Sequence, residues 1–389
     1  MESNLINRTR NNEQSKALNK WANSGFIGSI IAGTGFGKSK CGILACNYVL
    51  TNVIDSKMLI LVPTVQLQQQ FQDEFHKWGL GNCLVNLDIL CYQSAYKIKG
   101  NHYDLVLCDE IHLGLSKNHR KFFENNTWDK LLCMTATLPE EEEYRELLNT
   151  LAPPIYTITL DECVDKGIVA PYSIYCKKVV LTDTEQSNYK AINNKFLYYK
   201  YQLGQFDAFD EAKRILGDIN AAPREKQAAV QFYKAIRDRK TVVDFAENKI
   251  TAFQDLYLDN IDKQILVFSG ANEFTDKLCD SISPNAVSYH SKKTKKQKES
   301  ALKDFIDGTK NVLCSTKALN QGFDAPNATM GVICGITSKS LSMIQRVGRL
   351  IRFKEGKIGQ IYILYVENSQ EEKWLKASIK SLNNVTWLP

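Results

Sequence analysis

Residues 29–39 read Ser-Ile-Ile-Ala-Gly-Thr-Gly-Phe-Gly-Lys-Ser, and this stretch decides the fold. The apolar run from Phe26 to Ala32 predicts a buried strand, and a helical stretch opens at Lys38. A strand, a glycine-rich turn and a helix in this order make a cradle for phosphate groups. Three glycines let backbone N–H groups face inward, where a side chain would collide with the phosphates: Gly33, Gly35 and Gly37.

Two side chains of this cradle have predicted roles. Lys38 can reach the β- and γ-phosphates of a nucleoside triphosphate, and the Ser39 hydroxyl can ligate Mg²⁺. The strict pattern begins with glycine, whereas this chain has Ala32 at that position. A glycine-rich turn with a chance lysine is the alternative, and the rest of the sequence has to decide between the two.

Length and composition indicate a globular protein with more than one domain. A chain of 389 residues is too long for one ordinary domain, and 44% hydrophobic with 24% charged residues is typical of a folded protein. The longest apolar stretches are strand-sized and the N-terminus does not resemble a signal peptide, so we expect no membrane association and a cytoplasmic location. Eleven cysteines without a C-x-x-C pair favour buried, reduced thiols over zinc sites or disulfides.

The net charge of +6 is unevenly distributed along the chain. Residues 1–160 carry 15 Lys and Arg against 16 Asp and Glu, and the remaining residues carry 34 against 27. The second part is therefore where we expect contact with a polyanion, although a solvated basic surface would account for the charge as well.

Strands and helices alternate at both ends of the chain and not in its middle. Apolar strands at 57–64, 105–108 and 131–134 follow the cradle with helices between them, and the alternation resumes after residue 262. Over about 184–260 the sequence is charged and mainly helical, with a turn predicted near Arg239. Its tyrosines either stack on nucleic acid or form a small helical core, which is the interpretation we favour.

This pattern predicts an α/β fold with two parallel-sheet domains in tandem. We place the first domain at residues 1–165 and the second at residues 166–389, with the helical insertion in the second.

Carboxylates and hydroxyls follow two of the predicted strands. Asp109 and Glu110 come directly after the strand at 105–108, and a carboxylate at this position beside a phosphate cradle is what Mg²⁺ and an attacking water require. We expect Asp109 to hold the metal through its water shell and Glu110 to orient or deprotonate the water. The alternative is that these acids merely open a surface loop. Thr135 and Thr137, at the next strand tip, can bridge a metal-site carboxylate to a neighbouring element.

The second half carries arginines and no phosphate cradle. Arg346, Arg349 and Arg352 are three residues apart, which places them along one side of a helix. Such a triplet is usually a solvent face, but beside a triphosphate site it predicts arginine fingers that neutralise the γ-phosphate. Each half lacks what the other carries, so we expect the active site to form between them. The lysine-rich run at 291–298 is either a phosphate-backbone contact or a solvated helix start.

The ordered set of motifs resembles that of the superfamily 2 helicases and runs from Gln14 to Arg352. Residues 32–39 resemble motif I, Asp-Glu-Ile-His at 109–112 resembles a DExH-type motif II, and residues 345–352 match the Q-R-x-G-R-x-x-R of motif VI. Within the superfamily the chain is most similar to the DNA-directed branch of UvsW-like and XPB-like helicases. That placement rests on the DEIH motif, Tyr-Gln-Ser at 92–94, Tyr-His-Ser at 289–291 and Glu-Glu-Lys-Trp at 371–374.

The resemblance implies two RecA-like domains that bind ATP and Mg²⁺. It implies nucleotide binding by the Q motif, motif I and motif V, which here are Gln14, Gly33, Thr34, Gly35, Gly37, Lys38, Ser39, Gly322 and Asp324. The arginine that usually precedes the Q-motif glutamine by three residues is Asn11 here, which leaves base selectivity open. Ser39 and Asp109 are the implied Mg²⁺ ligands. The implied catalytic residues are Lys38, Asp109, Glu110, Gln345, Arg349 and Arg352.

The resemblance also implies contacts with nucleic acid and a coupling element. The implied nucleic-acid contacts are Pro63, Thr64, Tyr92, Gln93, His290, Lys292, Lys293 and Thr316. Coupling of hydrolysis to strand contact is implied for His112, Thr135 and Thr137.

The implied function is that of an ATP-dependent DNA helicase or translocase in replication, recombination or repair. We expect a monomer that acts on single-stranded or branched DNA in the cytoplasm, or in the host cytoplasm if a phage encodes it. An RNA helicase is one alternative. A nucleotide-regulated clamp that binds without unwinding is another, because no wedge is identifiable. A restriction-type motor fused to a nuclease is disfavoured, since no residues remain for a nuclease domain.

Overall fold

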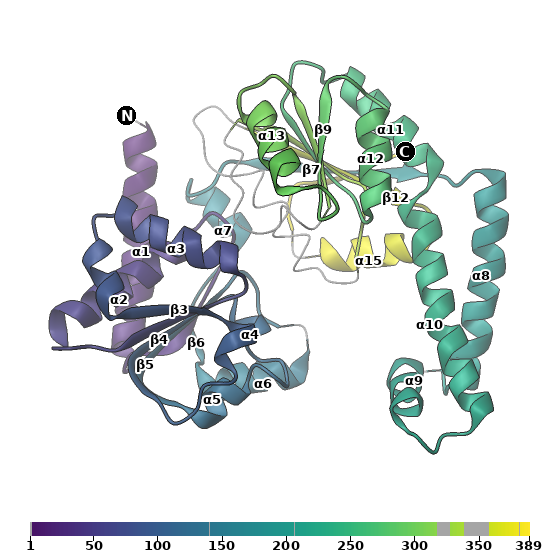
Figure 1. Ribbon diagram of the computed structural model, residues 1–389. Helices are drawn as coiled ribbons and strands as arrows, with labels where there is room; N and C mark the ends of the chain where they lie inside the picture. The colour runs from purple at the N-terminus through teal and green to yellow at the C-terminus, as the bar shows by residue number, and fades with distance from the viewer. Residues whose placement is uncertain (1, 140, 206, 317–326, 338–357, 381) are drawn as a thin grey trace. The chain divides into compact units, whose positions relative to one another are not determined.

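The structure is a computed structural model that describes residues 2–389 except 140, 206, 317–326, 338–357 and 381 (Figure 1). The chain divides into two compact units, and the division falls after Tyr172. The described residues within 1–172, 319–329 and 341–359 belong to the first unit, and those within 173–318, 330–340 and 360–389 belong to the second.

The first unit is built on a parallel sheet of six strands within its described residues. In sheet order these are β3 (Leu87–Cys91), β2 (Met58–Val62), β4 (His102–Asp109), β5 (Thr127–Thr135), β1 (Ile27–Ala32) and β6 (Pro154–Ile158). The inner strands are continuous apolar runs because both faces of a parallel sheet are covered by helices.

Helices cover both faces of this sheet (Figure 1). One face carries α1 (Glu2–Asn23), α2 (Lys38–Asn52) and α3 (Val65–Lys77). The other carries α4 (Tyr92–Ala95), α5 (Lys121–Asn125) and α6 (Glu142–Leu151), whose apolar side chains share a core with β2, β4 and β5. The short α7 (Leu160–Asp165) follows β6, and single 3₁₀ turns lie at Gly81–Asn86 and Ile111–Leu113.

Strand register brings the ends of three strands together at one edge of the sheet. Asp109 at the end of β4 pairs with Met134 of β5, and Ile31 of β1 pairs with Thr135 of β5. Because the strands are parallel, the turns after β1, β4 and β5 all leave from this carboxyl edge, where parallel sheets bind their ligands.

The second unit contains a sheet of seven strands within its described residues. In sheet order these are β13 (Val385–Leu388), β7 (Tyr172–Val179), β12 (Gly359–Val366), β11 (Met330–Ile333), β8 (Ile265–Phe268), β10 (Val312–Ser315) and β9 (Ala286–Tyr289). Helices α11 (Glu247–Leu258) and α12 (Asn272–Asp280) bury their apolar faces against β8, β10 and β11. The unit also contains α13 (Lys295–Ile306) and α15 (Gln370–Ser378).

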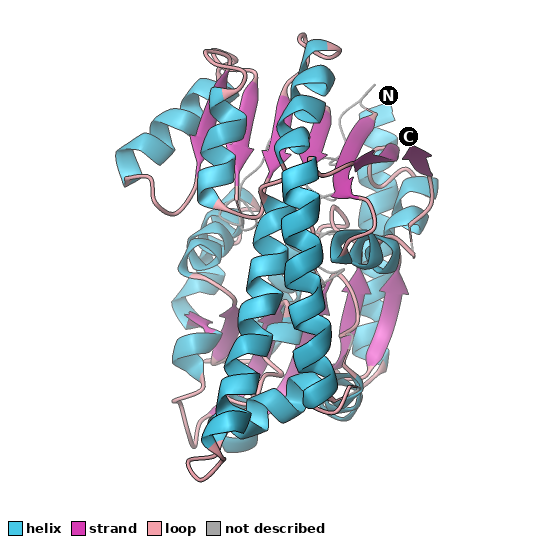
Figure 2. Cartoon of the chain, turned by 90° about the vertical axis from the view of Figure 1, so that its right-hand side faces the viewer, coloured by secondary structure: helices cyan, strands magenta, loops and turns pink. Residues whose placement is uncertain are grey.

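A helical hairpin occupies most of the predicted insertion. Helices α8 (Asp183–Gln202) and α10 (Pro223–Asp244) lie side by side, with α9 (Ala208–Gly217) at their far end (Figures 1 and 2). The hairpin has its own small core, formed by Leu203, Ala208, Ala212, Ile215, Ala229 and Phe232. The buried residues of this core are mainly alanine, with leucine, isoleucine and phenylalanine, and Tyr198 and Tyr201 remain exposed.

The turn predicted near Arg239 is wrong. Arg239 lies inside α10, where its guanidinium carbon is 4.1 Å from the centre of the Phe196 ring of α8. This cation–π contact holds the helix against its neighbour, so the break comes only at Phe245–Ala246, before α11. The strand β13 was also not predicted.

Two further expectations concern location and redox state. All eleven cysteines are free; ten are buried, and Cys279 is half-buried. Among the described helices, none is both long enough and apolar enough to cross a membrane.

Candidate nucleotide-binding site

The glycine-rich turn between β1 and α2 requires its glycines. Gly35 and Gly37 have φ values of 91° and 88°, a region that side chains with a Cβ rarely adopt. A Cβ on Gly35 would lie 2.3 Å from Cγ1 of Val169, and one on Gly37 would lie 2.4 Å from Nε2 of Gln14. Neighbouring parts of the first unit therefore crowd this loop, so glycine is needed here even before any phosphate is considered.

Gln14 is part of this loop's support and not a surface glutamine. Its side chain is 2% exposed, and its Nε2 donates to the backbone oxygens of Phe36, at 2.9 Å, and of Gly37, at 3.3 Å. Its Oε1 is buried and finds no hydrogen-bond partner among the described residues. The side-chain N–H group of Gln14 is thus bonded to the loop, while its Oε1 acceptor is available for a hydrogen bond from another group.

The loop also places Lys38 and two hydroxyls. Lys38 Nζ donates to the backbone oxygen of Ala32, 3.0 Å away, so the side chain folds back across the turn. Thr34 Oγ1 is buried and has no partner in the part of the chain that the structure describes, and Ser39 is half-buried in the first turn of α2. A cation, an unpaired hydroxyl and a helix N-terminus meet at this loop, which is the chemistry a phosphate group requires.

Asp109 ends β4 as a buried carboxyl group, 8% exposed. Burial, and after it the neighbouring Glu110 carboxyl group, raise the pKa of Asp109 from 3.8 to about 7, although the Lys38 ammonium opposes both effects. Asp109 ends β4 and the loop follows β1, so both leave the sheet at the same carboxyl edge. A divalent cation there would favour the ionised carboxylate.

Glu110, His112 and Thr135 form a cluster beside Asp109. Glu110 has φ 49° and ψ 54°, a left-handed conformation that is strained for a residue with a side chain. Its Oε2 lies 3.4 Å from His112 Nδ1 and 3.3 Å from Thr135 Oγ1. Thr135 Oγ1 is also 3.2 Å from His112 Nδ1 and 3.1 Å from the backbone oxygen of Thr137. The predicted coupling residues thus lie in one hydrogen-bonded group with Glu110.

The donor set fits a magnesium ion that keeps most of its water. Within the described ranges, no three His, Cys, Asp or Glu side chains are grouped so that they could enclose a metal. Mg²⁺ commonly binds through one or two protein oxygens together with water and substrate phosphates. Ser39 and Asp109 supply oxygens of this kind, from the first turn of α2 and from the end of β4 at the carboxyl edge of the first sheet.

Some predicted nucleic-acid contacts of the first unit are not available as side chains. Tyr92 is 1% exposed, and its hydroxyl donates to the backbone oxygen of Asp109 at 2.9 Å, so its side chain points into the first unit. Pro63 is buried, and Thr64 caps α3 by accepting from Leu67 N at 3.4 Å. Gln93 is exposed.

The predicted nucleic-acid contacts of the second unit also differ in their exposure. His290 is 2% exposed and its Nε2 lies 3.1 Å from Asp276, so its side chain points into the second unit. Lys293 pairs with Asp276 at 3.0 Å and the exposed Lys292 pairs with Glu273 at 2.5 Å, while Thr316 is 8% exposed. The predicted residues Gly322, Asp324, Gln345, Arg349 and Arg352 lie outside the described residues.

Two residues next to the loop were not anticipated from the sequence. Arg10 Nη2 donates to the backbone oxygen of Ile168 at 2.6 Å, and Glu13 Oε2 accepts from the Tyr156 hydroxyl at 2.6 Å. Arg10 and Glu13 share one face of α1 with Gln14, four and one residues before it. That helical spacing was the available signal, because a helix that presents Gln14 to the loop presents its neighbours too.

Comparison with known proteins gives consistent results. Residues 8–87 match the family described as type III restriction enzyme, res subunit, and residues 248–354 match the helicase conserved C-terminal domain. The DNA 3'-5' translocase XPB2 of Sulfurisphaera tokodaii is 24% identical over 88% of this chain and 78% of its own length.

Solved structures share the fold. The Hef helicase domain of Pyrococcus furiosus matches with a TM-score of 0.58 at 15% identity, over 92% of this chain and 96% of that chain. Dbp5 of S. cerevisiae, bound to RNA and ADP BeF3, also matches with a TM-score of 0.58 at 15% identity, over 97% of this chain and 89% of its own. Both units therefore have the fold of tandem RecA-like helicase domains, as predicted.

Proposed function

We propose that the chain is a superfamily 2 helicase related to the XPB-like DNA helicases, and that it uses ATP hydrolysis to move along DNA. As a helicase it is an ATPase that binds nucleotide. The observation that carries the assignment of its active residues is the meeting of Lys38, Asp109 and Glu110 at the carboxyl edge of the first sheet.

The loop residues bind and orient the triphosphate. Backbone N–H groups of the glycine turn and the N-terminus of α2 face the phosphates, and the partial positive charge of the helix favours an anion there. Lys38 exchanges the Ala32 carbonyl for phosphate oxygens, which restores a charged partner to its ammonium group. Ser39 and Asp109 would hold Mg²⁺, which when bound neutralises charge on the phosphates.

Glu110 is the group that acts on the attacking water. Glu110 follows Asp109 directly; its carboxylate accepts a hydrogen bond from Thr135 and lies 3.4 Å from His112 Nδ1. These partners fix the direction of the carboxylate, which then orients the water and accepts its proton. Any movement of the strand tip at Thr135 therefore changes the position of Glu110, and this supports a coupling role for His112, Thr135 and Thr137.

Base selection is proposed to depend on Gln14. Since its Nε2 is held by the carbonyls of Phe36 and Gly37, only Oε1 remains to contact a base. An acceptor in this place favours a base with an amino group, such as adenine, over guanine or uracil, which present carbonyl oxygens at the corresponding edge. The preference for ATP can thus be retained although Asn11 replaces the usual arginine.

Arg349 and Arg352 are proposed to complete the charge neutralisation of the γ-phosphate, with Gln345 near the attacking water. This part of the proposal rests on the match of residues 345–352 to motif VI. Arginine fingers are worth about 10³ to 10⁵ in rate in nucleoside triphosphatases.

DNA is the proposed track because a relative that matches 88% of this chain is named as a DNA translocase. The exposed Lys292 and Gln93 are the side chains that we propose for contacts with the strand. A role in replication, recombination or repair is part of the same proposal. The second candidate, movement on RNA, is favoured by the fold shared with Dbp5 and is separated by the experiment below.

The experiment compares ATP hydrolysis with single-stranded DNA, branched DNA and RNA of one sequence. We expect stimulation by DNA above that by RNA, and a loss of at least about 10²-fold in Glu110→Gln and Arg349→Ala while strand binding persists. Glu124→Gln is the matched control, because Glu124 is an exposed acid of the same unit that pairs only with Arg120 at 3.5 Å in the described chain. Hydrolysis at the wild-type rate by Glu110→Gln would contradict the proposal.

A further inference from the structure

We propose that Glu13 is a positioning residue that holds the phosphate-binding loop in its nucleotide-binding shape. The inference rests on the proposed function, because it concerns the same loop. Glu13 contacts no residue of the loop itself; it acts through Gln14 on one side and through Tyr156 on the other.

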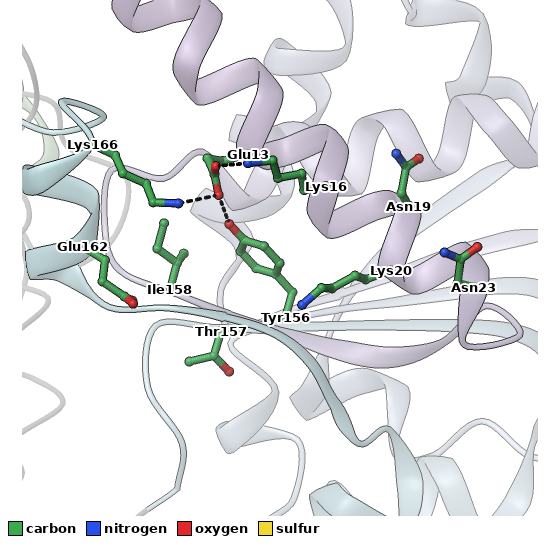
Figure 3. Close-up of a pocket in the computed structure, with 10 residues that line it drawn as sticks. All are labelled: Glu13, Lys16, Asn19, Lys20, Asn23, Tyr156, Thr157, Ile158, Glu162 and Lys166. Atoms are coloured by element: carbon green, nitrogen blue, oxygen red, sulfur yellow. Dashed lines mark hydrogen bonds and ion pairs between the residues drawn. The ribbon is translucent and has the colours of Figure 1, made fainter.

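Glu13 is a nearly buried carboxylate with three donors. Its side chain is 7% exposed. Oε2 accepts from the Tyr156 hydroxyl at 2.6 Å and lies 3.1 Å from Lys166 Nζ, while Oε1 lies 2.7 Å from Lys16 Nζ (Figure 3). Tyr156 belongs to β6, and Lys166 ends α7. A single carboxylate therefore fastens α1 to two elements that are about 140 to 150 residues further along the chain.

The first route to the loop is the adjacent glutamine. Arg10, Glu13 and Gln14 lie on one face of α1, and each bonds to a different segment of the first unit. Gln14 can reach the carbonyls of Phe36 and Gly37 only when this face of the helix is turned toward the loop. Glu13 sets that rotation, because the alternative would leave a buried charge without its partners.

The second route is the aromatic pair beneath the loop. The Tyr156 ring lies 5.8 Å from the ring of Phe36, which is 0% exposed. Phe36 is therefore held at its backbone by Gln14 and at its ring by Tyr156, and Glu13 fixes both of these partners. Gly35 and Gly37 flank Phe36, so a shift of this residue moves the N–H groups that face the phosphates.

A pocket of about 380 Å³ opens beside this network and is lined by Lys16, Lys20 and Lys166 together with Glu13 (Figure 3). Two of these lysines are paired with Glu13, so the pocket is the open side of the carboxylate's own ion-pair cluster. We assign no ligand to it. Solvent therefore reaches the lysine side chains, whereas the Glu13 carboxylate remains nearly buried.

The test measures ATP affinity separately from turnover. Glu13→Gln keeps the size of the side chain and removes the charge, and Tyr156→Phe keeps the ring against Phe36 and removes the hydroxyl. We expect the dissociation constant and the KM for ATP to rise by about tenfold in Glu13→Gln, because groups that orient a site's direct contacts typically carry a factor of 10 or more. The kcat at saturating ATP should change by less than about twofold, because no group that acts on the water is altered.

Asn126→Ala is the matched control for loss of stability. Asn126 is 6% exposed and donates to the backbone oxygens of Ile98 and Phe122 at 2.9 and 2.8 Å, remote in sequence from the loop. It should lower the melting temperature of the first unit and leave the KM for ATP unchanged. Tyr156→Phe should raise the KM less than Glu13→Gln, and the double variant should be no worse than Glu13→Gln alone, since the Tyr156 contact is one of the two routes by which Glu13 acts.

The outcomes separate the two proposals. If wild type binds ATP and Glu13→Gln binds it equally well, the positioning role is overturned and the proposed function stands. A rise in KM in Asn126→Ala as large as that in Glu13→Gln would also overturn it, because the effect would then be one of stability. If the wild-type protein does not bind ATP, the proposed function itself fails. Should Glu13→Gln not fold, an unchanged KM in Tyr156→Phe overturns the inference.

Discussion

Lys249 and Glu371 form an ion pair in which both side chains are 0% exposed. Lys249 Nζ lies 2.9 and 2.8 Å from the two carboxylate oxygens and donates to the backbone oxygen of Cys334 at 2.8 Å. Glu371 Oε2 also accepts from Val366 N at 3.0 Å. Burial raises the pKa of Glu371, and Lys249 opposes this effect. The pair ties α11 and α15 to the ends of β11 and β12 in the second unit.

Breaking this pair should strongly destabilise the second unit. Lys249→Met or Glu371→Gln leaves a buried polar group without its partner, which typically costs about 3 to 5 kcal/mol. The double variant Lys249→Met/Glu371→Met should cost less than either single change, because no unpaired charge remains. Urea unfolding followed by hydrogen exchange in the second sheet measures the effect. Glu367→Gln, which removes the half-exposed pair with Lys178 at 3.6 Å, should cost no more than about 1 kcal/mol.

Gly37→Ala should abolish nucleotide binding. It should also lower the free energy of unfolding by more than a strained turn alone would. Gly37 has φ 88°, and a Cβ there would meet Gln14 Nε2. Gly79 has φ 69° with no described atom within 4 Å of its Cβ position, so Gly79→Ala isolates the backbone strain of about 1 to 2 kcal/mol. Thermal melts and ATP titration of both variants make the comparison. Equal destabilisation by the two changes, with ATP binding intact in both, would contradict the prediction.

The stability of the first unit should depend on Glu13 in acid. Burial alone would raise the pKa of Glu13, but hydrogen bonds from Lys16, Tyr156 and Lys166 outweigh it and lower the pKa from 4.5 to about 2. Since the folded pKa is depressed, the ionised carboxylate stabilises the fold above pH 4.5, and this contribution is lost as the pH falls from 4.5 to about 2.

The contribution is at most about 3 kcal/mol, because each pH unit of such a difference corresponds to about 1.36 kcal/mol. Unfolding free energies of wild type and Glu13→Gln measured between pH 6 and pH 3 should converge as the pH falls. A constant difference across this range would show that the charge is not responsible.

The helical hairpin should unfold locally when a large side chain is removed from its core. Phe232 of α10 is 0% exposed, and its ring stacks on Phe196 of α8 with ring centres 5.5 Å apart. Phe232→Ala removes a buried aromatic ring, which costs about 3 to 5 kcal/mol. Hydrogen exchange should accelerate in α8, α9 and α10 while the sheets remain protected, because this core is separate from that of the sheet. Accelerated exchange throughout β8 and β10 would show that the hairpin is not an independent unit.

The sequence predicts the sheets well because their signals are local. Apolar runs followed by glycine, proline or acidic residues mark strands such as β2 and β4, and parallel topology then brings the turns after β1, β4 and β5 to one edge. The RecA-like fold follows from that alternation. The break of the long helix was misplaced: Arg239 lies inside α10 and contacts Phe196 of a different helix, and residue spacing along the sequence does not reveal such a contact.

Side-chain direction is what the sequence could not supply. Tyr92 and His290 stand at strand ends where nucleic acid was expected, yet both turn inward to bond with Asp109 and Asp276. The hydrogen-bond partners of Glu13 could not be predicted from the sequence, since Tyr156 and Lys166 are far away in the chain. In each case a tertiary hydrogen bond settles the orientation, and such bonds leave no periodic pattern in the sequence.

The strand order of the two sheets has a consequence for synthesis on the ribosome. The first sheet uses only residues 27–158, so it can assemble while the remainder is still being translated. In the second sheet β7 lies between β12 and β13, and β13 pairs Val385 with Ile174. The edge of β7 that pairs with β13 therefore stays unpaired until the ribosome has released residue 388. A nascent chain arrested before that point should offer an open strand edge to chaperones.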